Sequence, residues 1–143
     1  MPGHRIDPWT DRPERDRLLF ALASRWYQSA RVESSRPIAF LQHWFAIEVL
    51  AMPNSTNIAP LRSLVADATE SDENEWREFV GRLFGLRGLL VHGHSDQVSE
   101  PQLRAVSALA EVVLATYLGI GVTHQVGELR RAQLDLSAAR TDK

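Results

Sequence analysis

The 143-residue chain contains no cysteine and only two methionines. Without thiols it can form neither disulfides nor thiolate metal sites. No apolar run approaches the roughly 18 residues that a membrane-spanning helix needs, and no secretory signal follows the charged N-terminus. We therefore expect a soluble, cytoplasmic protein that does not interact with membranes.

The chain also lacks an excess of positive charge. Its 16 basic and 18 acidic residues give a formal net charge of −2 at pH 7. A protein that clamps nucleic acid along a broad surface carries many clustered lysines and arginines, so the composition argues against such a clamp but allows a local site. A length of 143 residues is typical of one domain that buries its own core.

No segment shows the strict alternation of apolar and polar residues that predicts a half-buried β-strand. Helical periodicity instead covers residues 13–31, 36–52, 61–68, 73–92 and 99–119. The pattern weakens over residues 120–143, where either a terminal helix or a tail is expected, and residues 1–12 are expected to be an N-terminal tail. We predict an all-α fold, a bundle of four to five helices centred on residues 13–119.

Two of the expected helices carry a capping signal at their start. Asp72 with Glu75, and Ser99 with Gln102, have the spacing of a capping box. In this motif the first side chain accepts a hydrogen bond from the backbone three residues on, and the later side chain returns one. We expect Asp72 and Ser99 to cap the helices of residues 73–92 and 99–119.

An arginine lies on the apolar side of the helix expected at residues 73–92. At about 100° per residue, Arg87 shares one face with a set of apolar positions, which are Trp76, Phe79, Val80, Leu83, Phe84, Leu86, Leu90 and Val91. A permanently charged guanidinium on a buried face needs a partner or a function. Glu48 lies on the apolar stripe of residues 36–52, where an unpaired carboxylate is strongly disfavoured. We predict that Arg87 and Glu48 form an ion pair.

The same helix ends on the run Val91-His92-Gly93-His94, in which Gly93 is typical of the glycine that stops a helix. On a continuous helix Arg87 and His92 would point about 140° apart, but a helix that ends at His92 lets both side chains turn toward one cleft. His94 offers a second imidazole, six residues after the arginine. Because no carboxylate or cysteine stands at a supporting spacing, we expect no metal site and no cofactor.

Three glycines follow the opposite face of this helix, at Gly81, Gly85 and Gly88. Each glycine costs about 1 kcal/mol relative to alanine inside a helix. Three on one side predict that another backbone approaches closely there, either within the chain or across a two-fold dimer.

The order and spacing of these residues resemble the HEPN superfamily, most closely its bacterial Apea-like branch. The resemblance covers residues 36–118 and rests on the two motifs Phe40-Leu41-x-x-Trp44-x-x-Ile47-Glu48-x-Leu50 and Leu83-x-x-Leu86-Arg87-x-x-x-Val91-His92-Gly93. HEPN domains are four- to five-helix bundles, usually homodimers, and many are metal-independent ribonucleases. The resemblance therefore implies a two-fold homodimer with Gly81, Gly85 and Gly88 at its interface.

The resemblance also implies a function, that of an endoribonuclease that cleaves single-stranded RNA. Arg87 and His92 from both chains would act together at the dimer cleft, with Glu48 and His94 in supporting or alternative roles. The products would be a 2′,3′-cyclic phosphate and a 5′-hydroxyl. Such an enzyme would act as a toxin or an antiphage effector, with an antitoxin or a nucleotidyltransferase as a further partner.

Two other functions fit the same residues. In a non-catalytic HEPN module that dimerises or binds RNA, Arg87 and Glu48 would be only a structural ion pair and His92 only a helix cap. Active members often have a polar residue after the motif arginine, whereas this chain has Gly88, and this difference favours the non-catalytic alternative. The third function is a helical accessory subunit that binds a protein or nucleotidyltransferase partner.

Overall fold

The structure, a computed structural model, describes residues 13–54 and 56–141 and contains six α-helices and no β-strand in those ranges. The all-α prediction is confirmed, although six helices form where four to five were expected. None of these helices is both long and apolar enough to cross a membrane. The helices are α1 (Glu14–Val32), α2 (Arg36–Ala51), α3 (Ala59–Thr69), α4 (Asn74–Val91), α5 (Glu100–Leu118) and α6 (Thr123–Thr141).

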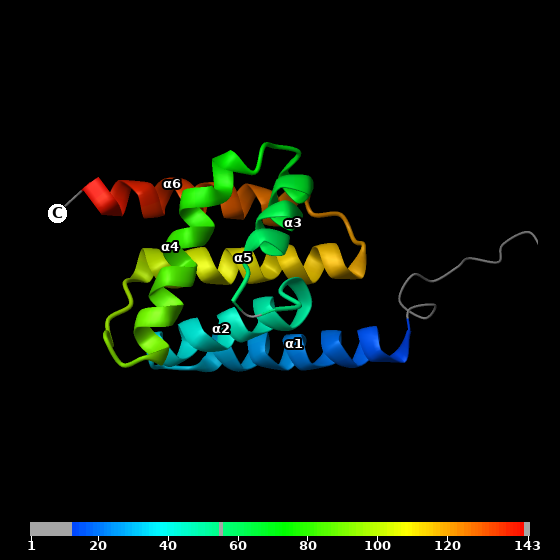
Figure 1. Cartoon of the computed structure of the whole chain (residues 1–143), viewed down its shortest axis with the longest axis horizontal. Helices are drawn as coiled ribbons and strands as arrows, with labels where there is room; N and C mark the ends of the chain where they lie inside the picture. The colour runs from blue at the N-terminus through cyan, green and yellow to red at the C-terminus, as the bar shows by residue number, and fades with distance from the viewer. Residues whose placement is uncertain (1–12, 55, 142–143) are drawn as a thin grey trace, which may run out of the picture.

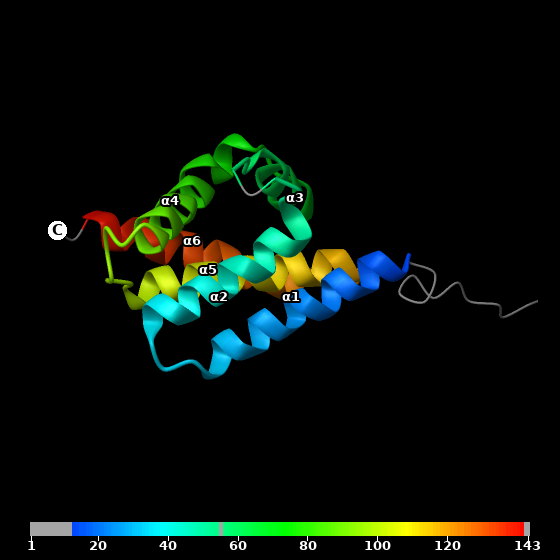
Figure 2. The same cartoon turned by 60° about the horizontal axis from the view of Figure 1, so that its bottom comes forward.

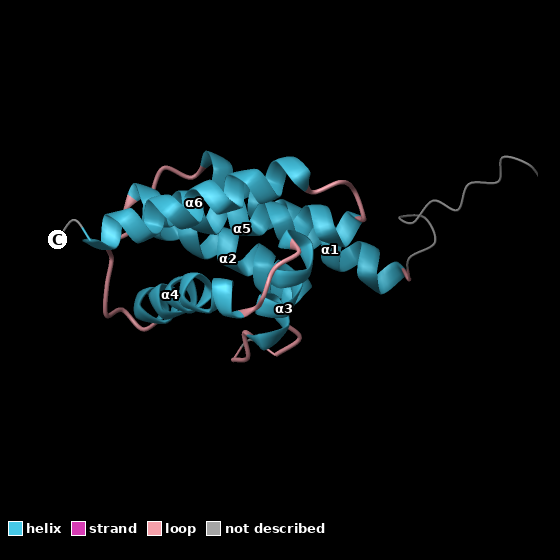
Figure 3. Cartoon of the chain, turned by 90° about the horizontal axis from the view of Figure 1, so that it is seen from above, coloured by secondary structure: helices cyan, strands magenta, loops and turns pink. Residues whose placement is uncertain are grey.

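Helices α1, α2, α5 and α6 run roughly along the long axis of the molecule, and α4 crosses them (Figure 1). Figure 2 shows α1 and α2 joined by a short turn, so that they lie side by side as a helical hairpin. Seen from above, α3 and α4 form a separate layer on one side of the other helices (Figure 3). The end of α4, with its predicted site residues, therefore lies on one outer face of the bundle.

The core is centred on α5, which contacts α1, α2, α3, α4 and α6. Its buried residues are spread over a broad face, as expected for a helix with neighbours on several sides; they are Ala105, Val106, Ala108, Leu109, Ala110, Val112, Val113 and Ala115. Trp44 of α2 and Trp76 of α4 are fully buried against this centre. Two indoles of this size supply much of the apolar surface that folding removes from water.

One of the two predicted capping boxes is present. The Ser99 hydroxyl accepts from the Gln102 N–H at 3.2 Å, and the Gln102 side chain accepts from the Ser99 N–H at 2.8 Å. The second prediction is wrong, because α4 begins only at Asn74 and Asp72 accepts from the Asn74 N–H at 2.8 Å instead. The Glu75 carboxylate pairs with Arg130 of α6 at 3.8 Å, a partner that local spacing could not indicate.

The C-terminal segment, for which a helix and a tail were both possible, forms α6 and packs against α5. Leu129, Ala132 and Leu136 of α6 are buried. Its apolar positions are few, which is why the sequence pattern was weak, but they coincide with the side that meets α5. The N-terminal tail expected at residues 1–12 lies outside the described residues.

His43 of α2 is buried, with only 3% of its surface exposed. Its ring packs edge-on against Tyr27 of α1 with 5.4 Å between the ring centroids, and its Nδ1 has no hydrogen-bond partner. Burial, together with the smaller effect of the nearby Arg31 charge, lowers the pKa of His43 from 6.5 to about 4. The imidazole is therefore neutral in the folded protein near pH 7.

This buried histidine makes the stability of the protein sensitive to acid. The unfolded chain binds a proton at His43 near the ordinary pKa of 6.5, and the folded chain does so only near 4. The free energy of unfolding should therefore fall as the pH falls through this window, by up to about 1.4 kcal/mol per pH unit. Urea unfolding of the wild type and of His43→Gln between about pH 7 and about pH 5 measures the effect.

Glutamine does not titrate, so the unfolding free energy of His43→Gln should depend less on pH over this range. Equal pH dependence in the two proteins would contradict the assignment of a depressed pKa to His43.

Candidate functional site

The end of α4 is fixed by a Schellman motif. His92 is the last residue of near-helical conformation, and Gly93 follows in the left-handed region with φ of +71°, which favours glycine. The His94 N–H donates to the Leu89 carbonyl at 2.8 Å, and the Gly93 N–H donates to the Leu90 carbonyl at 3.2 Å. The prediction that the helix stops at His92 is confirmed, and the backbone of the histidine loop is well defined.

The predicted ion pair between Arg87 and Glu48 is also confirmed. Arg87 Nε lies 3.3 Å from Glu48 Oε1 and links α4 to α2. The two side chains keep 23% and 17% of their surface exposed, so the pair lies at the edge of the core and not inside it. The Arg87 Nε–H makes no aligned hydrogen bond, and the attraction is therefore mainly coulombic. Part of the arginine side chain stays accessible to solvent.

Glu48 has a second partner that the sequence analysis missed. The indole N–H of the fully buried Trp44 donates to the same Glu48 Oε1 at 2.8 Å. Trp44 and Glu48 are four residues apart on α2, a spacing that brings helical side chains together and that could have indicated this bond. The indole holds the carboxylate in place, and the carboxylate in turn holds Arg87.

His92 lies on the outer side of α4, on the same line as the three glycines. Gly81, Gly85, Gly88 and His92 follow one another at helical spacing and fall within an arc of about 60°. His92 is exposed, and a Cβ added to any of these three glycines would meet no atom within 4 Å. No described segment of the chain packs closely on this face. The alternative that another backbone of the same chain approaches the glycines is therefore wrong. An approach by a second chain stays a prediction.

Within one chain, the predicted site residues form two separate pairs, and no contact joins one pair to the other. Arg87 contacts Glu48, and the rings of His92 and His94 lie with centroids 6.4 Å apart. Over the described ranges, Arg87 and His92 share no hydrogen bond, ion pair or ring contact. The structure therefore does not show Arg87 and His92 joined in one site within the chain.

A groove of about 540 Å³ lies beside His94, between the start of α2 and the end of α4. Its lining residues are Pro37, Ile38, Leu41, Leu90, Gly93, His94, Ser95 and Asp96. Ile38, Leu89 and Val91 are each about half exposed at this end of the molecule. Apolar side chains are thus partly exposed around the histidine loop.

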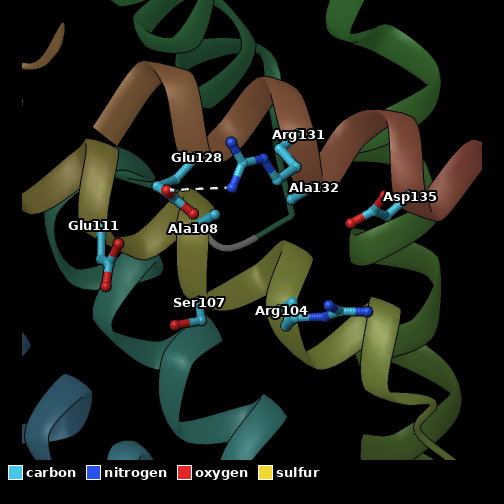
Figure 4. Close-up of a pocket in the computed structure, with 8 residues that line it drawn as sticks. All are labelled: Arg104, Ser107, Ala108, Glu111, Glu128, Arg131, Ala132 and Asp135. Atoms are coloured by element: carbon cyan, nitrogen blue, oxygen red, sulfur yellow. Dashed lines mark ion pairs between the residues drawn. The ribbon is translucent and has the colours of Figure 1, made fainter. Parts of the chain in front are cut away.

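A second cavity, of about 300 Å³, lies between α5 and α6 (Figure 4). Charged side chains of both signs line it, and Glu128 and Arg131 approach each other to 4.0 Å across one turn of α6. This cavity contains none of the residues that the sequence singled out. Among the described residues, no group of three or more histidines, aspartates or glutamates is arranged to hold a metal ion.

The contacts of Glu48 predict an order of stability among single variants. Glu48→Ala removes both the partner of Arg87 and the acceptor of the buried Trp44 N–H, and should lower the unfolding free energy by about 2–3 kcal/mol. Glu48→Gln keeps an acceptor for Trp44 and should cost about 1–2 kcal/mol, because the ion pair is partly screened by solvent. His92→Ala changes an exposed side chain and should cost about 1 kcal/mol or less.

Denaturant unfolding of the three variants beside the wild type measures this order. If Glu48→Gln were as damaging as Glu48→Ala, the Trp44 hydrogen bond would contribute nothing. If His92→Ala were as damaging as either, the cluster would not be the main link between α2 and α4.

Comparisons with known proteins do not assign the chain to a family. No protein-family model, curated protein or solved structure matches it. Evidence for its function therefore comes from the residues and geometry of the chain itself.

Proposed function

We propose that the protein is a metal-independent endoribonuclease that cleaves single-stranded RNA in the cytoplasm and acts as a homodimer. The observation that carries the proposal is the arrangement at the end of α4. There Arg87 is held by Glu48 with part of its side chain accessible, and His92 is exposed on a helix face that no described segment covers. The HEPN resemblance of the sequence supports the same function.

The residue types suit RNA cleavage without a metal. The 2′-hydroxyl must lose a proton as it attacks the phosphorus, and the 5′-oxygen must gain one as its bond to phosphorus breaks. Histidine can accept and donate protons near neutral pH, so His92 is the proposed acid or base. Arg87 keeps its charge and can bind the phosphoryl oxygens through paired donors. The products are a 2′,3′-cyclic phosphate and a 5′-hydroxyl, and DNA, which has no 2′-hydroxyl, is not cleaved.

The homodimer in the proposal explains why Arg87 and His92 do not meet within one chain. A two-fold axis beside the glycine face of α4 would bring two copies of His92 together, and the long Arg87 side chains would have to reach the same groove from the edge of the core. Gly81, Gly85 and Gly88 leave room for a second backbone, since a Cβ at each of them would point into open space. The half-exposed Leu89 and Val91 supply apolar surface beside that face.

A second candidate function is a non-catalytic module that dimerises or binds RNA. Two observations favour it: Arg87 already has a charge partner in Glu48, and the residue after it is Gly88 instead of a polar side chain. The biological role that we infer for an active enzyme is that of a toxin or an antiphage effector. An antitoxin or a nucleotidyltransferase is the corresponding partner, and an accessory role toward such a protein is the remaining alternative.

The catalytic proposal predicts that Arg87→Ala and His92→Ala each abolish RNA cleavage in a buffer containing EDTA. The double variant should be little worse than either single one, because the two side chains act on one phosphate. Arg87→Lys should also fail, since an ammonium group cannot reproduce the paired donors of the guanidinium. Cleavage of labelled single-stranded RNA by purified protein measures these effects, with an identical DNA strand as the negative substrate.

The control is His94→Ala, which changes the second imidazole of the same loop. Full activity in this variant would assign the proton transfers to His92, and loss of activity would assign them to His94. Thermal melts must show that Arg87→Lys stays folded. A folded wild type that cleaves no RNA would support the non-catalytic module instead.

The homodimer predicts a specific effect of a bulky side chain on the glycine face. Gly85 is exposed and a Cβ there would meet nothing within 4 Å, so the Gly85→Leu monomer should fold normally, but the leucine should separate the two helices and weaken the dimer. Light scattering at micromolar concentration measures the mass of both proteins. Ala139→Leu, at an exposed position of α6, is a matched control that should leave the mass unchanged. A monomeric wild type would contradict the proposal.

A further inference from the structure

We propose that the groove beside His94 binds a guanine base, with Asp96 recognising the donor edge of that base. For an RNA substrate the proposal rests on the ribonuclease function proposed above, but binding of the base itself can be measured without any cleavage. The groove lies between the start of α2 and the end of α4, next to the exposed histidines.

The groove has the size and the walls that a nucleobase requires. Its volume of about 540 Å³ falls in the range of small-molecule sites, which are concave and mostly apolar with a few polar groups. Pro37, Ile38, Leu41 and Leu90 line its apolar part. A base is flat and apolar on its two faces, so such walls can hold it while its polar edge turns toward the open end.

Ser95 and Asp96, which follow His94 in the chain, supply polar groups to the lining of the groove. Asp96 is exposed and makes no hydrogen bond or ion pair with any described residue. A free carboxylate repels the phosphates of RNA, so its presence in a nucleic-acid groove is unfavourable unless it accepts hydrogen bonds from a base. Asp96 therefore indicates recognition of N–H groups and not of the RNA backbone.

Guanine is the base whose pairing edge matches a carboxylate best. Its N1–H and its exocyclic amino group are adjacent donors, and two carboxylate oxygens can accept from both at once. Adenine and cytosine each place an acceptor nitrogen beside their amino group, and uracil has a single N–H between two carbonyl oxygens. Each of these would face the carboxylate with at least one repulsive lone pair, so Asp96 selects guanine.

His94 connects this groove to the proposed reaction. It lines the groove, and its ring lies 6.4 Å from that of His92. Imidazole rings stack on unpaired bases in single-stranded RNA. A guanine in the groove that stacks on His94 would leave its attached phosphate beside His92, so cleavage would occur next to a guanosine.

Binding of mononucleotides to the purified protein tests the proposal. Guanosine 5′-monophosphate should bind about tenfold or more tightly than the adenosine, cytidine and uridine monophosphates, because a bidentate contact discriminates by about this factor. Asp96→Asn keeps the size of the side chain but replaces one acceptor by a donor, and should abolish the preference. Asp135→Asn, an exposed aspartate on α6 away from the groove, is the matched control and should retain it. Titration calorimetry measures the four affinities for each protein.

The result that overturns the proposal is equal affinity for the four mononucleotides, or a guanosine preference that survives in Asp96→Asn. Cleavage of RNA strands that contain a single guanosine separates this result from the ribonuclease proposal. Selective binding without cleavage would leave the guanine site standing and reject the enzyme. Cleavage at every base, with no selective binding, would reject the guanine site and leave the enzyme.

Discussion

The contact on which the site depends is the cluster of Trp44, Glu48 and Arg87 between α2 and α4. A fully buried indole N–H must find an acceptor, and the Glu48 carboxylate supplies it. That carboxylate cannot be left without a counter-charge at the edge of the core, and Arg87 lies 3.3 Å away. Trp44 therefore fixes the position of Glu48, and Glu48 fixes the position of Arg87. The Arg87 side chain is held at the edge of the core with part of its surface still accessible.

The two sides of α4, the helix that carries Arg87, differ in burial. Trp76, Val80 and Leu83 fill the core on the inner side. On the outer side, the three glycines and His92 leave a smooth strip that no described residue covers. Arg87 lies on the inner side, where the contact with Glu48 holds it, and 23% of its side chain stays exposed at the edge of the core. This division explains how one helix can serve stability and the proposed function without conflict between them.

Much of the fold follows from local patterns in the sequence. Helical periodicity predicts the first five helices to within a few residues, because burial of one face demands a regular spacing of apolar side chains. The Ser99 cap and the stop at Gly93 also depend only on neighbouring residues. The predicted capping box at Asp72 did not form, because α4 begins only at Asn74 and the Asp72 side chain accepts from the Asn74 N–H. The sequence pattern indicated α6 only weakly, because this helix has few apolar residues. These few are enough to hold it against the apolar surface of α5.

For the candidate site, the sequence by itself determined that Arg87 and Glu48 must be satisfied and that the helix ends at His92. Both conclusions need only the chemistry of each side chain and the rotation per residue. The sequence also predicted that these two charges pair, and the spacing of Trp44 and Glu48 allowed their hydrogen bond. Only the tertiary structure decided that the pair lies at the edge of the core and that the glycine strip is open. It also placed a groove with Asp96 beside His94, although α2 and the histidine loop are far apart in the chain. The physical reason is that contacts between distant segments depend on how whole helices pack, which no local spacing encodes.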